Sequence, residues 1–176
     1  MTTQENLKSS FAGESQASRK YLYFAERAEK EGHLQIARLF RAASEAETIH
    51  ARNHLEAMQG IGATGDNLKA AVRGEHYEFT EMYPPYIADA KSEGNRRAEL
   101  SLAHANEVEK THHKLYREAL AALERADRMP EGPYYVCPVC GETIFGKAPD
   151  ECRRSKLSTS YARGARIVKN SIANCS

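Results

Sequence analysis

Two short motifs, each a glutamate followed three residues later by a histidine, carry the clearest chemical signal in this sequence. They are Glu47-Thr-Ile-His50 and Glu109-Lys-Thr-His112. Residues three apart lie on one face of an α-helix, so each motif presents a carboxylate and an imidazole in the same direction. A single copy is more often a solvated helix face than a metal site. Two copies of the motif in one chain are a far more specific signal of a metal site.

Two further glutamates stand on comparable helical stripes. Glu14 and Glu75 lie among apolar residues that recur every three or four positions, as do Glu47 and Glu109. A buried carboxylate without a partner costs several kcal/mol, and these stripes contain no Lys or Arg, so bound cations are the simplest counter-charge. Two glutamates plus two such Glu/His pairs form the ligand set of carboxylate di-metal bundles. Carboxylates with imidazoles favour iron or manganese, although affinity order alone allows zinc.

Three more residues are candidates for the same site. Glu78 lies one turn after Glu75 and is a possible further ligand or a solvated helix-face residue, whereas Ala17 holds the equivalent place in the first half of the chain. Tyr21 and Tyr83 lie one to two turns beyond candidate glutamates. A phenol there could hydrogen-bond a ligand carboxylate or a bound oxidant, and an ordinary core tyrosine is the alternative.

Four helices must position these residues. Glycines that end helices, and a Pro/Gly cluster near residue 130, divide the chain. Thr2 and Glu5 form an expected capping box at the first helix, and Pro84-Pro85 predicts a kink or break in the third. The expected helices cover residues 4–31, 33–59, 67–93 and 95–128. Helices of this length with short turns predict an all-α, four-helix bundle over residues 1–130.

The bundle contains one helical hairpin twice. Gly32 precedes Glu47 by 15 positions, and Gly94 precedes Glu109 by the same number. If a two-fold axis across the bundle relates the repeats, the second and third helices point the same way. The link between these two helices would then have to run the length of a helix, about 40 Å. Residues 61–66 span only about 20 Å even when fully extended. The bundle is therefore either a simple up-down one or a helix-swapped homodimer.

The four cysteines all lie beyond position 136, which predicts a local site rather than a disulfide framework. Cys137-Pro-Val-Cys140-Gly141 resembles half of a rubredoxin site, because CxxC followed by Gly forms a knuckle with amides directed at the sulfurs. Cys152 resembles the start of the second half, but Ser155 stands where a fourth cysteine is expected, and Arg153-Arg154 replace a small and apolar pair. After Glu151 the chain has six basic residues and no acidic one.

We therefore expect residues 131–176 to form a truncated or degenerate rubredoxin-like segment with three possible states. Cys175 is the fourth ligand, or the Ser155 oxygen ligates a weakened iron or zinc site, or the segment is partly disordered through a reading-frame change. The abrupt change of composition favours the last of these.

The composition limits the classes of partner that we expect for this protein. The net charge of +1 gives no reason to expect nucleic acid. No stretch approaches the length of a membrane span, and the first residues lack the basic start and apolar run of a signal peptide. We expect a cytoplasmic protein with no membrane partner.

Four motifs together resemble the rubrerythrin family over about residues 1–130. They are Phe11-Ala-Gly-Glu-Ser-Gln-Ala17, the two Glu/His pairs and Gly74-Glu-His-Tyr-Glu-Phe-Thr-Glu-Met-Tyr-Pro84. The resemblance implies a ferritin-like bundle with bridging Glu47 and Glu109, exchange of His50 for Glu78 on oxidation, and Tyr21 and Tyr83 as hydrogen-bonding partners. It implies these di-iron ligands: Glu14, Glu47, His50, Glu75, Glu78, Glu109 and His112. It further implies mononuclear iron or zinc at Cys137, Cys140 and Cys152.

The resemblance also implies an activity, the reduction of hydrogen peroxide to water in oxidative-stress defence. Electrons would come from an external donor, either rubredoxin or an NAD(P)H-dependent reductase, and the resemblance favours the helix-swapped homodimer. The alternative is a ferroxidase that binds and stores iron, which requires neither Glu78 nor a rubredoxin-like segment. A third reading, an oxygen-activating oxidase, needs a substrate cavity beside the metals.

Overall fold

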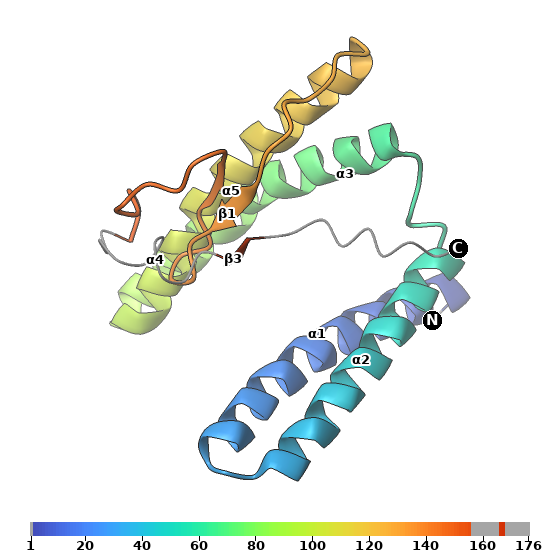
Figure 1. Ribbon diagram of the computed structural model, residues 1–176, viewed down its shortest axis with the longest axis vertical. Coiled ribbons are helices and arrows are strands. Elements are labelled where there is room, and N and C mark those ends of the chain that lie inside the picture. The colour runs from blue at the N-terminus through green and yellow to red at the C-terminus, as the bar shows by residue number, and fades with distance from the viewer. Residues whose placement is uncertain (1, 156–165, 168–176) are drawn as a thin grey trace. The chain divides into compact units, whose positions relative to one another are not determined.

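The fold is dominated by helices, with a small β-sheet near the end of the chain (Figure 1). The computed structural model describes residues 2–155 and the backbone of residues 166–167. The chain divides into two compact units, Met1–Ala63 and Thr64–Ser176. Among the helices of the described residues, none is both long and apolar enough to cross a membrane.

The first unit is a helical hairpin of α1 (Thr3–Lys30) and α2 (Leu34–Ala57), close to the predicted bounds. The predicted capping box is confirmed: the Glu5 amide donates to Thr2 Oγ1 at 3.2 Å, and the Thr2 amide donates to Glu5 Oε2 at 2.6 Å. Gly32 turns the chain with φ +83°, a conformation in which glycine carries no Cβ penalty.

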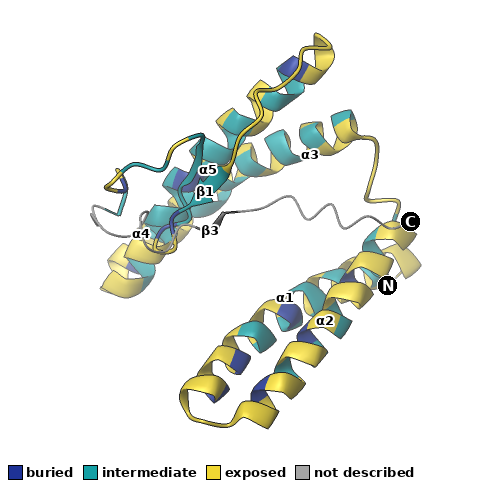
Figure 2. Cartoon of the chain, in the orientation of Figure 1, coloured by how far each residue is buried: buried dark blue, intermediate teal, exposed yellow. Residues whose placement is uncertain are grey.

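Small residues form the seam between α1 and α2. Ala25 and Ala37 are almost fully buried, and the Ser44 hydroxyl donates to the Ser18 carbonyl oxygen at 2.8 Å. Figure 2 shows buried positions on the sides of these helices that face each other. Large apolar side chains contribute less to this seam; Ile36, for example, is 49% exposed. The seam is therefore built on close backbone approach more than on large apolar side chains.

The second unit begins with a helical hairpin whose first arm is interrupted by a π-helix. Its elements are α3 (Thr64–Tyr77), the π-helix η1 (Glu78–Met82), α4 (Tyr83–Ser92) and α5 (Arg96–Glu124). Asn95 caps α5, because its side-chain oxygen accepts from the Ala98 amide at 3.1 Å. The prediction placed the start of the first arm at residue 67 and the end of the second at residue 128. The arm starts three residues earlier, and α5 ends four residues earlier.

The predicted break in the third helix exists, but its place and kind differ from the expectation. The turn widens before Pro84-Pro85, and the Tyr83 amide donates to the Glu78 carbonyl, five residues back. In a continuous α-helix the proline rings would collide with the carbonyls of Thr80 and Glu81 and leave them without donors. The π-helix absorbs this conflict, and the prolines then lie in the first turn of α4, where no intrahelical donor is needed.

The segment after α5 has its own small sheet of β1 (Tyr134–Val136), β2 (Thr143–Phe145) and β3 (Arg166–Ile167). The order is β2-β1-β3 and both pairings are antiparallel, with Val136 opposite Thr143 and also opposite Arg166. Three cysteines form a buried cluster beside this sheet. Residues 131–155 are thus folded, and the predicted disorder concerns residues that lie mostly outside the described ones.

Candidate metal centre

The first unit brings together three of the predicted ligands. Glu14 comes from α1, and Glu47 and His50 come from α2, with one ligand atom of each within 4.8 Å of the others. His50 Nδ1 lies 2.8 Å from Glu47 Oε2. This contact with His50, followed by a hydrogen bond with Glu14, lowers the pKa of Glu47. We refer to Glu14, Glu47 and His50 as the first triad.

The second unit contains the equivalent group, the second triad of Glu75, Glu109 and His112. Their ligand atoms again lie within 4.8 Å of one another. His112 Nδ1 is 2.7 Å from Glu109 Oε2 and 3.9 Å from Glu75 Oε2. Glu75 comes from α3 and the other two from α5, as the repeat predicts. In both triads Nδ1 is the histidine nitrogen that faces the carboxylates.

The charges of the second triad are poorly compensated by protein groups. Burial, followed by a hydrogen bond and repulsion from Glu109 and by repulsion from Glu78, raises the pKa of Glu75 to about 8. Burial and the charge of Glu109 also raise the pKa of Glu78, and His112 offsets part of this rise. A cation among these oxygens would relieve the repulsion, so the donor set fits a carboxylate-bound metal.

Glu78 begins the π-helix and Tyr83 directly follows it, and charges of the second triad act on both groups. Burial is the main cause that raises the pKa of the Tyr83 phenol, and the charges of Glu78, Glu109 and Glu75 add to it. Tyr21 lies among aromatic rings of the first unit, with its ring centroid 6.0 Å from that of Phe40. Direct contact of Tyr21 with the first triad therefore stays a prediction.

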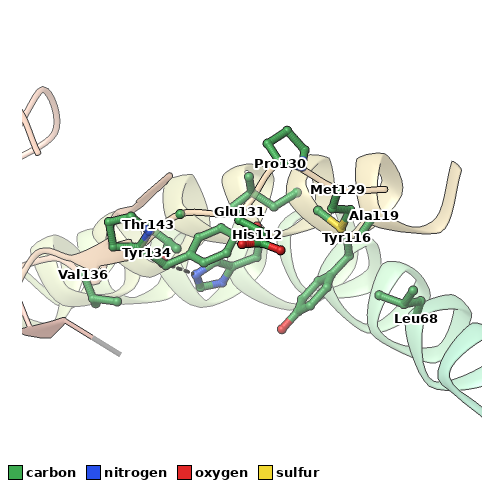
Figure 3. A pocket seen from close by; sticks show the side chains of 13 residues that line it. Leu68, His112, Tyr116, Ala119, Met129, Pro130, Glu131, Tyr134, Val136 and Thr143 are labelled. Atoms are coloured by element: carbon green, nitrogen blue, oxygen red, sulfur yellow. Dashed lines mark hydrogen bonds between the residues drawn. The ribbon is translucent and has the colours of Figure 1, made fainter. Parts of the chain in front are cut away.

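One contact of the second triad was missed by sequence reasoning. His112 Nε2 lies 3.0 Å from Thr143 Oγ1, on β2 (Figure 3). The threonine hydroxyl also donates to the Gly141 carbonyl at 3.2 Å, so it is placed to accept from His112. A proton on Nε2 leaves Nδ1 as the metal-facing nitrogen. No spacing rule relates these two residues, which are 31 positions apart.

A cavity of about 1200 Å³ opens beside His112, between α5 and the segment that leads to β1. Its wall includes Tyr116, Tyr134 and the apolar Leu68 (Figure 3). Burial raises the pKa of Tyr116, and the charges of Glu75 and Glu109 raise it further. The charges of the second triad therefore act on Tyr116. Tyr116 was not selected as a site residue from the sequence, and its position one turn after His112 is the signal that would have found it.

The predicted cysteines form a second, separate cluster in the same unit. One sulfur from each of Cys137, Cys140 and Cys152 lies within 4.8 Å of the others. The Gly141 amide donates to the Cys137 carbonyl at 2.9 Å, which closes the predicted knuckle. Burial raises the pKa of Cys140 to about 12. Cys152 is buried too, yet hydrogen bonds from Ser155 and Arg154 lower its pKa to about 7. Cys175 lies outside the described residues.

Arg154 attaches the cysteine cluster to α5. Its guanidinium donates to Glu107 Oε2 and to Thr111 Oγ1, both at 3.0 Å, and forms an ion pair with Glu142. Thr111 Oγ1 in turn donates to Glu142 Oε1 at 3.1 Å. Arg154, which departs from the rubredoxin pattern, thus holds the cysteine cluster beside α5, the helix that carries Glu109.

The chain is similar to known proteins over most of its length. The sequence profile of the Rubrerythrin family matches residues 5–120. The chain is 34% identical to Rubrerythrin-2 of Clostridium acetobutylicum over 85% of this chain and 89% of that protein. It is 34% identical to nigerythrin of Nitratidesulfovibrio vulgaris over 86% and 80%. A structure of partially reduced nigerythrin matches at 29% identity with a TM-score of 0.54, covering 95% of this chain and 87% of that one.

Helical hairpins that carry matched carboxylate and histidine triads define a ferritin-like di-metal protein. More narrowly, the chain belongs to the rubrerythrin family. The family cofactor is a di-iron centre, and the chain is an oxidoreductase of this class. The cysteine cluster offers a further set of groups suited to iron or zinc.

Proposed function

We propose that this protein is a di-iron peroxidase that reduces hydrogen peroxide to water in oxidative-stress defence. The overall reaction consumes one peroxide, two electrons and two protons and yields two water molecules. Ferrous iron held by the two triads would supply the two electrons that cleave the O–O bond. The observation that carries this function is the pair of matched triads with a further carboxylate, Glu78, whose pKa is raised by burial and by the charge of Glu109.

Each residue has a defined part in this proposal. The two triads and Glu78 would hold the metals, and Glu47 and Glu109 would serve as the carboxylates shared by both metals. Glu78 would supply negative charge to the oxidised metals in place of His50. The contact of His112 with Thr143 would keep this second imidazole in place while His50 moves. Because the pKa of the Tyr83 phenol is raised, this group keeps its proton near the carboxylates. It can therefore donate a hydrogen bond to them.

We further propose that two chains pair in a helix-swapped homodimer, so that each di-iron centre uses triads of both kinds. The internal repeat and the short link at residues 61–66 support this arrangement, because the link is too short for a crossover within one chain. Light scattering should give twice the chain mass of 19.7 kDa. A monomer that binds two irons per chain would contradict helix swapping.

The electrons come from outside the chain in this proposal, from rubredoxin or from an NAD(P)H-dependent reductase. Peroxide is the second partner. The ferroxidase alternative predicts a different use of the same triads, namely oxidation of iron by dioxygen followed by accumulation of ferric product.

One experiment separates these functions. The protein is loaded anaerobically with ferrous iron, and its ferric absorbance is followed after rapid mixing with hydrogen peroxide or with dioxygen. Oxidation that is much faster with peroxide, with iron staying at two per chain in the bundle, supports the peroxidase. Faster oxidation by dioxygen, with ferric iron accumulating beyond that ratio, would establish the ferroxidase instead.

A further inference from the structure

Ser155 stands at the free corner of the cysteine cluster. Cys140 Sγ and Cys152 Sγ are 3.6 Å apart, and Cys137 Sγ is 3.7 Å from Ser155 Oγ. Around a tetrahedral ion with metal–sulfur bonds of about 2.3 Å, two sulfurs lie about 3.8 Å apart. A sulfur and an oxygen bound at about 2.1 Å lie about 3.6 Å apart. Both observed separations thus match edges of one tetrahedral site.

The surroundings are those of a metal site and not of a disulfide. A sulfur–sulfur bond is about 2.05 Å long, far shorter than the 3.6 Å seen between Cys140 and Cys152. The Glu142 amide is directed at the Cys140 sulfur, and the Arg154 and Ser155 amides at the Cys152 sulfur. Such amides stabilise metal-bound thiolates. Cys137 is 1% exposed and Cys152 is 0% exposed, so water has little access to their sulfurs.

We propose that Ser155 supplies the fourth ligand through its hydroxyl oxygen, so that residues 137–155 hold one thiophilic divalent ion, zinc or ferrous iron, in a three-sulfur, one-oxygen site. Oxygen is a harder donor than thiolate and favours ferric over ferrous iron. If the bound iron were oxidised to the ferric state, it would accept an electron less readily than in a four-thiolate site, and zinc would accept none. This site does not depend on the peroxidase activity proposed above.

The proposal is tested with Co²⁺ added to the full-length, metal-free protein. Sulfur-to-cobalt charge-transfer absorbance reports only the cysteine cluster, because the triads contain no sulfur. Wild type should show the intensity of three thiolates. Ser155→Cys should raise that intensity by about one third, from three thiolates to four. Ser155→Ala should keep three-thiolate intensity and bind Co²⁺ at least about tenfold more weakly.

Two controls distinguish a bound serine from other arrangements. In Ser155→Ala the fourth position is open, so azide should alter the cobalt ligand-field bands of this variant and leave wild type unchanged. An equal azide response in both proteins would show that the serine is only a hydrogen-bond donor. Cys175→Ala should match wild type, and a loss of about one quarter of its thiolate intensity would make Cys175 the fourth ligand. If Ser155→Ala does not fold, Ser155→Cys decides, since an unchanged intensity there overturns the proposal.

Discussion

Replacement of Arg154 by methionine should loosen the cysteine cluster from α5. The side chain of Arg154 is 26% exposed and that of its ion-pair partner Glu142 is 14% exposed, whereas that of Glu107 is 46% exposed. Removing one partner of a fully buried pair costs about 3–5 kcal/mol, and an exposed pair contributes about 0–1 kcal/mol. Because the pair with Glu142 lies between these limits, we expect a loss of about 2 kcal/mol. Methionine keeps most of the apolar stem, so packing changes little.

This loss corresponds to an increase of about thirtyfold in local opening, since about 1.4 kcal/mol is a factor of ten. Hydrogen exchange of the β1 and β2 amides measures it directly, because these amides exchange when the segment opens. The matched control is Arg153→Met, which removes the same charge at an exposed neighbouring position and should exchange within about twofold of wild type. Equal exchange in Arg154→Met and Arg153→Met would refute the attachment by Arg154.

The second triad leads to three further expected results. The pKa of Glu75 is raised from 4.5 to about 8, so its contribution to stability is full below about pH 4.5 and is lost as the pH rises through about 8. The Tm of the metal-free protein should fall across this window, and Glu75→Gln should flatten the fall. Glu78→Gln should keep two irons per chain but slow the stopped-flow reaction with peroxide about tenfold, whereas Glu81→Gln, at an exposed position, should react like wild type. Thr143→Val should weaken ferrous iron binding about 10–100-fold in a chelator competition, because His112 loses its hydrogen bond; unchanged affinity would show that the threonine does not orient this ligand.

Local information was sufficient to predict the helices and the composition of each triad. Capping residues and glycines set the helix ends within a few positions, because they act on their own turn. The Glu/His pairs followed from helical periodicity alone, since residues three apart must share a face. The same reasoning selected Glu78 and Tyr83, whose pKa values are affected by charges of the second triad, and their roles at a metal stay predictions.

Contacts between distant segments could not be predicted in this way. Thr143 reaches His112 because the cysteine segment folds back on α5, and Arg154 reaches Glu107 for the same reason. Both pairs connect residues more than 30 positions apart, where no period applies. Sequence reasoning placed Ser155 at the position of the fourth ligand but could not show that Ser155 Oγ lies 3.7 Å from Cys137 Sγ.

The π-helix also bears on the lengths of the two hairpins. Seventeen positions lead from Glu14 to Glu31 in the first hairpin, and eighteen lead from Glu75 to Glu93 in the second. Beyond these points the spacings to the two Glu/His pairs are equal, so the first arm of the second hairpin is one residue longer than that of the first.

That extra residue falls where the helix widens. Tyr21 follows Glu14 by seven positions and Tyr83 follows Glu75 by eight. An α-helix turns about 100° per residue, so an uninterrupted helix would carry Tyr83 off the face of Glu75. A π-turn takes up a single inserted residue without altering the phase on either side. The two hairpins thus differ in length by one residue, and the π-helix keeps Tyr83 in the register that Tyr21 has in the first hairpin.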